Sequence, residues 1–309
     1  MLNDKHMNFT CQTKSPYTLR LLMKYMSNED YIDRITLYIT PTGIYCSHLL
    51  DDDSTISFHL LSEKFDTYAL PNGKSFRVSI YPSRLYSILK EIQRKDKVTL
   101  SIYSVQRILA ISYGTVTQKL QIGETKYLTE EETSSLSSVV NNVTSLQTKT
   151  ALRNIMSTSD FQNAVKLFDS SPELIVRGTI EGKVVCIFRS EYTSIRVNMT
   201  SPEEKDRVST KREYKVSNTD WWDYIKPLSE IASLTKDLLF CFDTNLSIIV
   251  PISPLGNLVL VCKHSEPDKE SDSESEEERD SYHTTPIPKD IQTPPDSPKE
   301  NEDDGCVLM

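Results

Sequence analysis

Residues 35–68 constrain the fold more than any other stretch, because their hydrophobic pattern is that of paired strands. Ile35, Leu37 and Ile39 alternate with Thr36, Tyr38 and Thr40, which is the period-two pattern of a strand with one buried face. The segments that follow predict turns and two more strands: a Pro-Thr-Gly turn at 41–43, a strand over 44–48, an acidic loop at 51–53 and a strand over 55–61. The stretch therefore predicts antiparallel strands joined by short turns.

The remaining patterns predict the same arrangement of short helices and strands twice. Apolar residues at helical spacing predict helices over 15–26, 82–94, 159–168 and 220–228. Pro227 is expected to limit the last helix, because proline disrupts a helix interior. Alternation predicts strands over 76–80, 98–102, 107–112, 174–188 (a hairpin turning at 181–182), 195–199, 212–216, 238–242, 246–252 and 258–262.

These elements divide the chain into four parts. We expect a first domain over 1–113, a polar interdomain connector over 114–147, a second domain over 148–264 and a tail over 265–309. The tail holds 15 acidic and 4 basic residues, which leaves 29 acidic and 31 basic residues in 1–264. The tail's composition predicts disorder, whereas the folded part is mildly basic and compatible with nucleic-acid contact.

No catalytic constellation stands out. The six cysteines form no CxxC pair, and the five histidines are scattered. Asp51, Asp52 and Asp53 could be imagined as a metal site, but a solvated loop is the better interpretation without partner carboxylates at defined spacing. With no signal peptide and no membrane-length apolar run, we expect an intracellular protein that is not an enzyme and binds no cofactor or metal.

The order and spacing of several residues resemble a known family. Gly43-Ile44, Asp53-Ser54, Ser57 and Phe65-Asp66-Thr67-Tyr68 resemble the first domain of proliferating cell nuclear antigen, the eukaryotic sliding clamp. Phe161, Asp169, Leu174, Gly182 and the closing strands fit the family's second domain in order. The resemblance covers residues 10–264 and implies an α+β fold of two similar clamp domains, with antiparallel sheets outside and four short helices on the inner, DNA-facing side.

The resemblance also implies contact with duplex DNA that does not depend on sequence. Such contact needs cations facing phosphates rather than groups that read bases. The candidates on and beside the four helices are Lys14, Arg20, Lys24, Arg84, Lys90, Arg94, Lys166 and Lys226. The second half supplies fewer of them, so the expected DNA-facing side is less basic there.

Family members bind short peptides with paired aromatic residues in a pocket beneath the interdomain connector. The equivalents here are Leu49, Leu50, Ile56, Leu128, Ser247, Ile249 and Leu260. Ile56 and Ile249 could equally be core residues. The family often has a proline near Ser247 and Ala-Pro after the last strand, where this chain has Cys262-Lys263. The resemblance thus implies a DNA polymerase and other replication or repair proteins as partners, recognised differently in detail.

Edge strands that could pair with a second subunit are expected at Arg107 to Ser112 and Ile195 to Met199, by analogy with the family. The interface candidates are Arg107, Leu109, Ile111, Ile195 and Val197. A homotrimeric ring is expected, with a clamp loader as a further partner. A monomer or a heterotrimer stays open.

The resemblance implies a sliding clamp that serves as a DNA polymerase processivity factor. A subunit of a checkpoint-type clamp and a monomeric viral processivity factor remain alternatives of the same class. The last four residues, Cys306 to Met309, form a CaaX box of the type usually farnesylated. An adaptor that keeps the clamp fold and joins a membrane through Cys306 is therefore a further alternative. The added tail favours a virus-encoded member, acting in the nucleus or at a cytoplasmic viral replication site.

Overall fold

The computed structural model describes residues 7–27, 32–50, 54–136, 153–168, 173–178, 184–199, 213–216, 220–242 and 245–262. All structural statements below concern these ranges. Several predicted features lie outside them: the loop at 51–53, the turn at 181–182, residues 137–147 of the connector, the tail and Cys306.

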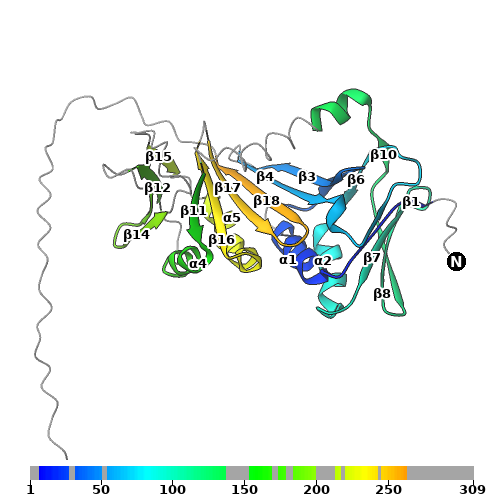
Figure 1. Cartoon of the computed structure of the whole chain (residues 1–309), viewed down its shortest axis with the longest axis horizontal. Helices are drawn as coiled ribbons and strands as arrows, with labels where there is room; N and C mark the ends of the chain where they lie inside the picture. The colour runs from blue at the N-terminus through cyan, green and yellow to red at the C-terminus, as the bar shows by residue number, and fades with distance from the viewer. Residues whose placement is uncertain are drawn as a thin grey trace, which may run out of the picture. The chain divides into compact units, whose positions relative to one another are not determined.

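The first half alternates strands with two helices in the predicted order (Figure 1). Its elements are β1 (Met7–Thr13), α1 (Pro16–Met26), β2 (Ile35–Thr40), β3 (Gly43–Leu49), β4 (Thr55–Leu61), the 3-10 turn η2 (Ser62–Lys64), β5 (Thr67–Ala69), β6 (Phe76–Ile80), α2 (Pro82–Glu91), β7 (Val98–Tyr103), β8 (Ile108–Tyr113), β9 (Val116–Gln121) and β10 (Lys126–Tyr127). A further helical stretch covers 130–136.

The second half has a similar order, a strand, a helix, a set of strands, a second helix and closing strands, with fewer strands in each set. Its elements are β11 (Arg153–Ser157), α4 (Thr158–Lys166), β12 (Glu173–Gly178), β13 (Val184–Arg189), β14 (Ser194–Met199), β15 (Glu213–Val216), α5 (Asp220–Ile231), the 3-10 turn η4 (Ala232–Leu234), β16 (Asp237–Phe242), β17 (Leu246–Ile252) and β18 (Gly256–Cys262). The predicted helices and strands are thus present with shifted ends, and the structure adds β1, β5 and β11 as well as strands in the connector, which were not predicted.

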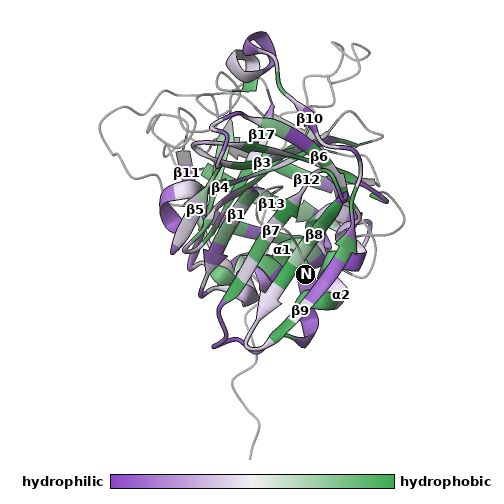
Figure 2. Ribbon diagram, turned by 90° about the vertical axis from the view of Figure 1, so that its right-hand side faces the viewer, coloured by the Kyte–Doolittle hydropathy of each residue, from purple (hydrophilic) through white to green (hydrophobic). Residues whose placement is uncertain are grey.

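The two halves share one sheet. The nine-stranded sheet has the order β10-β6-β2-β3-β4-β18-β17-β16-β11. The halves meet where β4 pairs with β18, antiparallel, with Ile56 opposite Leu260. Two smaller sheets have the orders β5-β1-β7-β8-β9 and β14-β13-β12-β15. Figure 2 shows hydrophobic segments along β7 and β8 and hydrophilic ones along β9, at the edge of its sheet.

The four helices lie in a row along one side of the nine-stranded sheet (Figure 1). Neighbours in the row are α2 and α1, then α1 and α5, then α5 and α4. Each helix buries the apolar stripe that its spacing predicts, as with Leu22 and Met26 of α1 and Phe161 of α4. One hydrophobic core therefore fills the space between the helices and the sheet.

Helix ends follow local chemistry. The Ser157 hydroxyl accepts a hydrogen bond from the backbone N–H of Asp160, which caps α4. The predicted limit of α5 at Pro227 is wrong, because the helix continues to Ile231. Leu228 and Ile231 are 0% and 1% exposed, so their burial offsets the hydrogen bond that proline cannot donate. Helix α2 ends at Glu91, three residues before its predicted end.

The predicted connector is partly folded. Residues of β9 pair with β8, so the five-stranded sheet extends past the predicted boundary at 113. After β10, Thr129 and Glu132 form a reciprocal capping box, with the Glu132 N–H donating to the Thr129 hydroxyl at 3.1 Å. Arg77 of β6 lies 3.5 Å from the Glu132 carboxylate. This part of the predicted connector is therefore held against β6.

Candidate functional site

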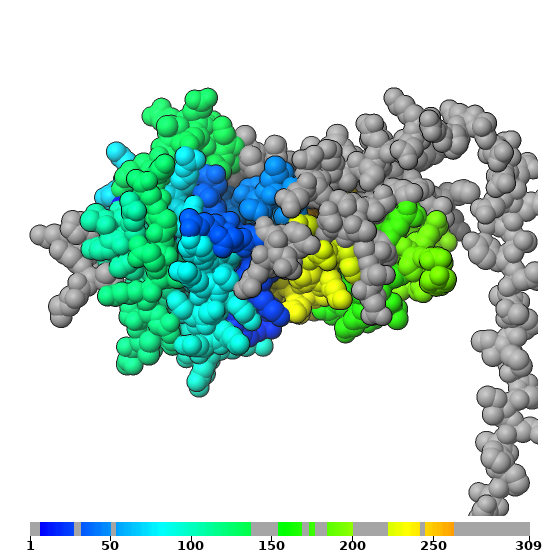
Figure 3. All heavy atoms as spheres, turned by 180° about the vertical axis from the view of Figure 1, so that it is seen from behind, coloured from blue at the N-terminus to red at the C-terminus, as the bar shows by residue number. Residues whose placement is uncertain are grey.

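The eight cations predicted to face DNA lie on or beside the four helices. Arg20, on α1, is half-buried. The other seven are exposed: Lys14 before α1, and Lys24, Arg84, Lys90, Arg94, Lys166 and Lys226 on or next to a helix. Figure 3 shows the N-terminal (blue) and α5 (yellow) residues side by side on one surface. The predicted cations are thus gathered on the helical side of the molecule.

Two of these cations already have anionic partners. The ammonium group of Lys24 on α1 lies 2.5 Å from a carboxylate oxygen of Glu230 on α5. Lys14 lies 3.7 Å from Asp66. No carboxylate among the described residues lies within 4.0 Å of the other six: Arg20, Arg84, Lys90, Arg94, Lys166 and Lys226. These six are the ones available to phosphate.

Four arginines are held on two tyrosine rings. The guanidinium carbons of Arg20 and Arg94 lie 4.7 and 4.8 Å from the centroid of the Tyr17 ring. Those of Arg34 and Arg84 lie 4.4 and 4.6 Å from the Tyr81 centroid. We call these groups the Tyr17 cluster and the Tyr81 cluster. Both are cation–π contacts, which attract a guanidinium to the ring face.

Sequence reasoning missed three members of these clusters: Tyr17, Arg34 and Tyr81. A signal existed for part of each cluster, because each tyrosine lies three residues before an arginine on the same helix face. Arg34 and Arg94 come from other segments, and only the tertiary structure brings them to the rings. Arg34 also lies 3.8 Å from Asp33 and donates a hydrogen bond to the Tyr81 hydroxyl.

Charge is distributed unevenly over the row of helices. Helices α1 and α2 carry four basic residues and one acidic residue, a net charge of +3. Helices α4 and α5 carry two basic and four acidic residues, a net charge of −2. The expectation of a less basic second half therefore holds for these helices, and the first half is where an anionic ligand is attracted.

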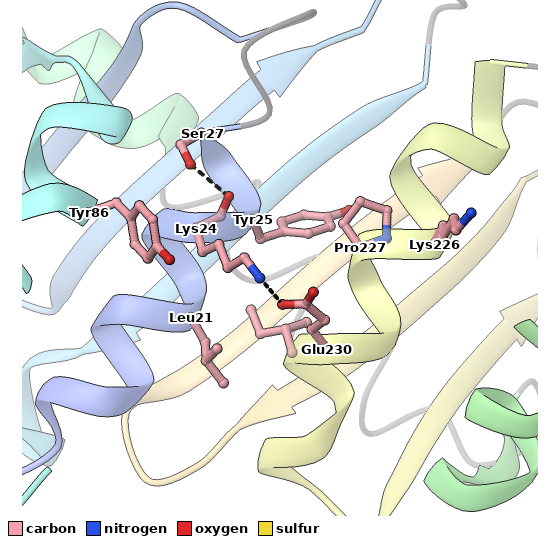
Figure 4. Close-up of a pocket in the computed structure, with 9 residues that line it drawn as sticks. Leu21, Lys24, Tyr25, Ser27, Tyr86, Lys226, Pro227 and Glu230 are labelled. Atoms are coloured by element: carbon pink, nitrogen blue, oxygen red, sulfur yellow. Dashed lines mark hydrogen bonds and ion pairs between the residues drawn. The ribbon is translucent and has the colours of Figure 1, made fainter. Parts of the chain in front are cut away.

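A cleft of about 380 Å³ lies between α1 and α5 (Figure 4). The Lys24–Glu230 pair spans it, and Lys226 and Pro227 line the α5 side. Tyr25 lies in the cleft wall with 5% of its surface exposed, and no hydrogen-bond partner for its hydroxyl lies among the described residues. Burial raises the pKa of that hydroxyl above its usual range, so it stays protonated.

A second hollow, of about 470 Å³, lies at the start of α1. Lys14, Tyr17 and Arg94 line it from the first half, and Ser233 and Ser253 line it from the second. The Thr18 hydroxyl donates to the backbone oxygen of Ser253 at 3.1 Å. This contact ties the start of α1 to the turn between β17 and β18.

The face of the nine-stranded sheet opposite to the helices carries a second candidate surface. Cross-strand partners share a face, so Leu49, which pairs with Thr55, lies on the same face as Val261 and Ser247. By the same register, Ile249 shares this face with Val259 and Leu239. Leu49 is 65% exposed. We call this row of residues on β3, β4, β18, β17 and β16 the outer-face row.

Two solved structures that resemble this one are both of PCNA, a sliding clamp. The structure resembles A. fulgidus PCNA, solved with the C-terminal region of FEN-1 bound, with a TM-score of 0.62, 14% identity and coverage of 84% of this chain and 100% of that chain. The chain has the sliding-clamp fold. It resembles the PCNA of Entamoeba histolytica as closely, with a TM-score of 0.62, 13% identity and coverage of 84% and 99%. The sequence matches no protein-family model and no curated protein.

The clamp fold confirms the predicted fold class and corrects part of the predicted peptide pocket. Leu50, Ile56 and Leu260 are 4%, 1% and 1% exposed and belong to the core beneath the helices, so they cannot contact a partner on the outer face. The alternation of each strand places Ile56 and Leu260 on the helix side. Ile249 is also fully buried, at 0%, but in a separate cluster with Cys241 and Val259 on the outer face.

Leu128 is not brought to the outer-face row. Its backbone N–H donates to the oxygen of Ser75, just after β10. In the sheet order, β6, β2 and β3 stand between β10 and β4. Of the predicted pocket residues, the described structure therefore groups Leu49, Ser247 and Ile249 on one face.

The predicted edge strand of the first half is wrong. Strand β8 lies between β7 and β9, and Leu109 and Ile111 are 3% and 0% exposed. Arg107 lies in the turn before β8, with a positive φ of 53°. Strand β9 is at the edge of this sheet instead. The prediction missed it because its polar sequence was assigned to the connector. In the second half, β14 is at a sheet edge, as expected for Ile195 and Val197.

The described residues include no group of three or more His, Cys, Asp or Glu side chains suited to a metal ion. The cysteines at 11, 46, 186, 241 and 262 are buried, and burial raises the pKa of the Cys46 thiol to about 12. In the described ranges, no helix has the length and hydropathy needed to cross a bilayer.

Proposed function

We propose that the protein is a DNA sliding clamp, a processivity factor that encircles or cradles duplex DNA and tethers replication and repair enzymes. The observation that carries the proposal is the row of four helices on one side of a sheet shared by two similar halves. Six cations on and beside this row have no carboxylate within 4.0 Å among the described residues. The protein acts as a scaffold and performs no chemistry on the DNA.

Contact with DNA is through phosphates and independent of sequence. Exposed lysines and arginines bind phosphate by charge and release condensed counterions. Each phosphate contact contributes about −0.9 to the slope of log K against log salt concentration. These six cations together would contribute about −5 to the slope for one subunit.

Partner peptides bind on the outer-face row. The A. fulgidus clamp was solved with the C-terminal region of FEN-1, which supports the same kind of partner here. Leu49 offers exposed apolar area beside Ser247 and Val261. An extended peptide with aromatic anchors, from a DNA polymerase or a repair enzyme, suits such a surface.

Ring assembly uses the edges of β9 and β14. Both strands are at the end of their sheets among the described residues, and an edge strand of one subunit can pair with the other edge strand of the next. A heterologous contact of this kind closes into a ring, and a homotrimer is the state we propose. A closed ring requires a clamp loader to open it around DNA.

Light scattering of the full chain after gel filtration, at low and high salt, tests the assembly. A mass near three subunits supports the closed ring. A mass of one subunit contradicts it and points to a cradle that charge alone holds on DNA. Binding to a labelled duplex of about 30 base pairs tests the DNA contact in parallel. Absence of binding at about 50 mM salt, with two unrelated duplex sequences, would refute the proposed function.

A further inference from the structure

The Tyr17 and Tyr81 clusters each hold two guanidinium groups against one ring, and we infer that both are phosphate clamps. The inference rests on the proposed function and names which groups grip the DNA: two pairs of arginines, positioned by tyrosines, that bind phosphate oxygens of the duplex backbone. Both clusters belong to the first half of the subunit, at the starts of α1 and α2. No equivalent pair occurs among the described residues of the second half.

The geometry of the Tyr17 cluster favours an anion between its arginines. The guanidinium carbons of Arg20 and Arg94 lie 4.7 and 4.8 Å from one centroid, so they are at most the sum of these, 9.5 Å, apart. Two positive charges this close repel each other, and a negative group bound near both reduces the repulsion. No carboxylate among the described residues is within 4.0 Å of either one to do so.

The Tyr81 cluster has the same arrangement with one difference. Arg34 and Arg84 lie 4.4 and 4.6 Å from the centroid, hence at most 9.0 Å apart. Arg34 lies 3.8 Å from Asp33, which offsets part of its charge. Its hydrogen bond to the Tyr81 hydroxyl fixes the guanidinium a second time. Arg84 has no such carboxylate in the described ranges.

Positioning on a ring matters because free arginine side chains lose rotamer freedom when they bind. Holding the planar guanidinium on a ring beforehand reduces that cost, and the fork of N–H donors stays free at its rim for bidentate contact with phosphate. A lysine keeps the charge but lacks the planar fork. Tyr17 and Tyr81 are therefore positioning residues, and the arginines make the contacts.

Space for an oxyanion lies next to the Tyr17 cluster. The hollow of about 470 Å³ is lined by Arg94 and Tyr17 themselves, with Lys14 and the serines at 15, 233 and 253. Asp66 lies 3.7 Å from Lys14 and partly offsets its charge. Cations and hydroxyls thus surround a volume larger than a phosphate group, on the half of the helical row with net positive charge.

The test compares full-length variants by fluorescence anisotropy with a labelled duplex of about 30 base pairs, across about 50 to about 200 mM salt. Tyr17→Leu removes the ring and no charge. We expect its affinity for DNA to fall about five- to tenfold, with the salt slope unchanged, because only positioning is lost. Tyr17→Phe keeps the ring and should restore the affinity. Tyr192→Leu, at an 88% exposed tyrosine, is the matched control.

Two further arms complete the test. Arg94→Lys keeps the charge at an exposed position, and its affinity for the duplex should fall about fivefold. This variant tests the inference even if Tyr17→Leu does not fold. Inorganic phosphate should compete with the duplex better than chloride at equal ionic strength. Wild-type affinity in both Tyr17→Leu and Arg94→Lys overturns the inference while leaving the clamp function intact. Loss of duplex binding by the unmodified protein refutes the proposed function instead.

Discussion

The Lys24–Glu230 pair leads to a prediction about which cations contribute to DNA binding. Lys24 is on the helical side with the other predicted cations, but its ammonium group is 2.5 Å from the Glu230 carboxylate. Lys90 on α2 is exposed and has no carboxylate within 4.0 Å in the described ranges. A neutralised lysine releases no counterion on binding phosphate, so the two lysines should behave differently when they are removed.

The size of the difference follows from counterion release. Lys90→Ala should make the salt slope about 0.9 less steep, which is about 3.5-fold in affinity over a fourfold change in salt concentration. Lys24→Ala should leave the slope near its original value, because the carboxylate already compensates the charge. Glu230→Gln should make the slope steeper by up to about 0.9, since it frees Lys24 for phosphate. The side chains are 45% and 54% exposed, so either change costs less than about 1 kcal/mol of stability.

Fluorescence anisotropy with a duplex of about 30 base pairs, at salt concentrations from about 50 to about 200 mM, measures all three slopes. Circular dichroism melting of each variant verifies that it is folded. Equal changes of slope in Lys24→Ala and Lys90→Ala would refute the reasoning, because they would show that the ion pair does not shield Lys24 from DNA.

Three further predictions concern stability. Ile56→Ala should cost about 2–5 kcal/mol in urea unfolding, whereas Leu49→Ala should cost under about 0.5 kcal/mol; equal costs would mean that the two faces of the sheet are misassigned. Gly256→Ala should destabilise the clamp severely in the same assay, since an added Cβ would lie 1.9 Å from the backbone oxygen of His59; a wild-type midpoint would contradict this contact. Burial lowers the pKa of His59 to about 4. The unfolded chain therefore takes up this proton first, so stability should fall as pH drops from about 6.5 towards about 4. His59→Gln should lose less stability over that range, and an identical pH profile would contradict the assignment.

The sequence predicted the elements well because their signals are local. Period-two alternation located β2 and β4, and helical spacing located the stripe of α1 that includes Leu22. Alternation separates the two faces of a strand, but it does not show which face packs against the helices and which lies on the outer side of the sheet. Ile56 and Leu260 were therefore expected on the partner surface, although the register places them opposite each other on the helix side.

The errors at the site come from contacts between distant segments. Glu230 neutralises Lys24 across 206 positions of sequence, and no local pattern announces that pairing. Strand β9 is too polar to be recognised as a strand from alternation alone; pairing with β8 defines it. Helix α5 continues past Pro227 because buried neighbours stabilise the last turn, which is tertiary packing overriding propensity.

The ladder between β4 and β18 bears on how a ring of such subunits could open. Hydrogen-bonded pairing from Thr55 to Leu60 runs straight across the boundary between the halves, and the shared core lies beneath it. A hinge at that boundary would break these hydrogen bonds and expose the core at the same time. Each subunit is therefore expected to move as one rigid body. In the proposed ring, opening would therefore take place where the β9 edge of one subunit leaves the β14 edge of the next, and the strength of that contact would set the energy needed to admit DNA.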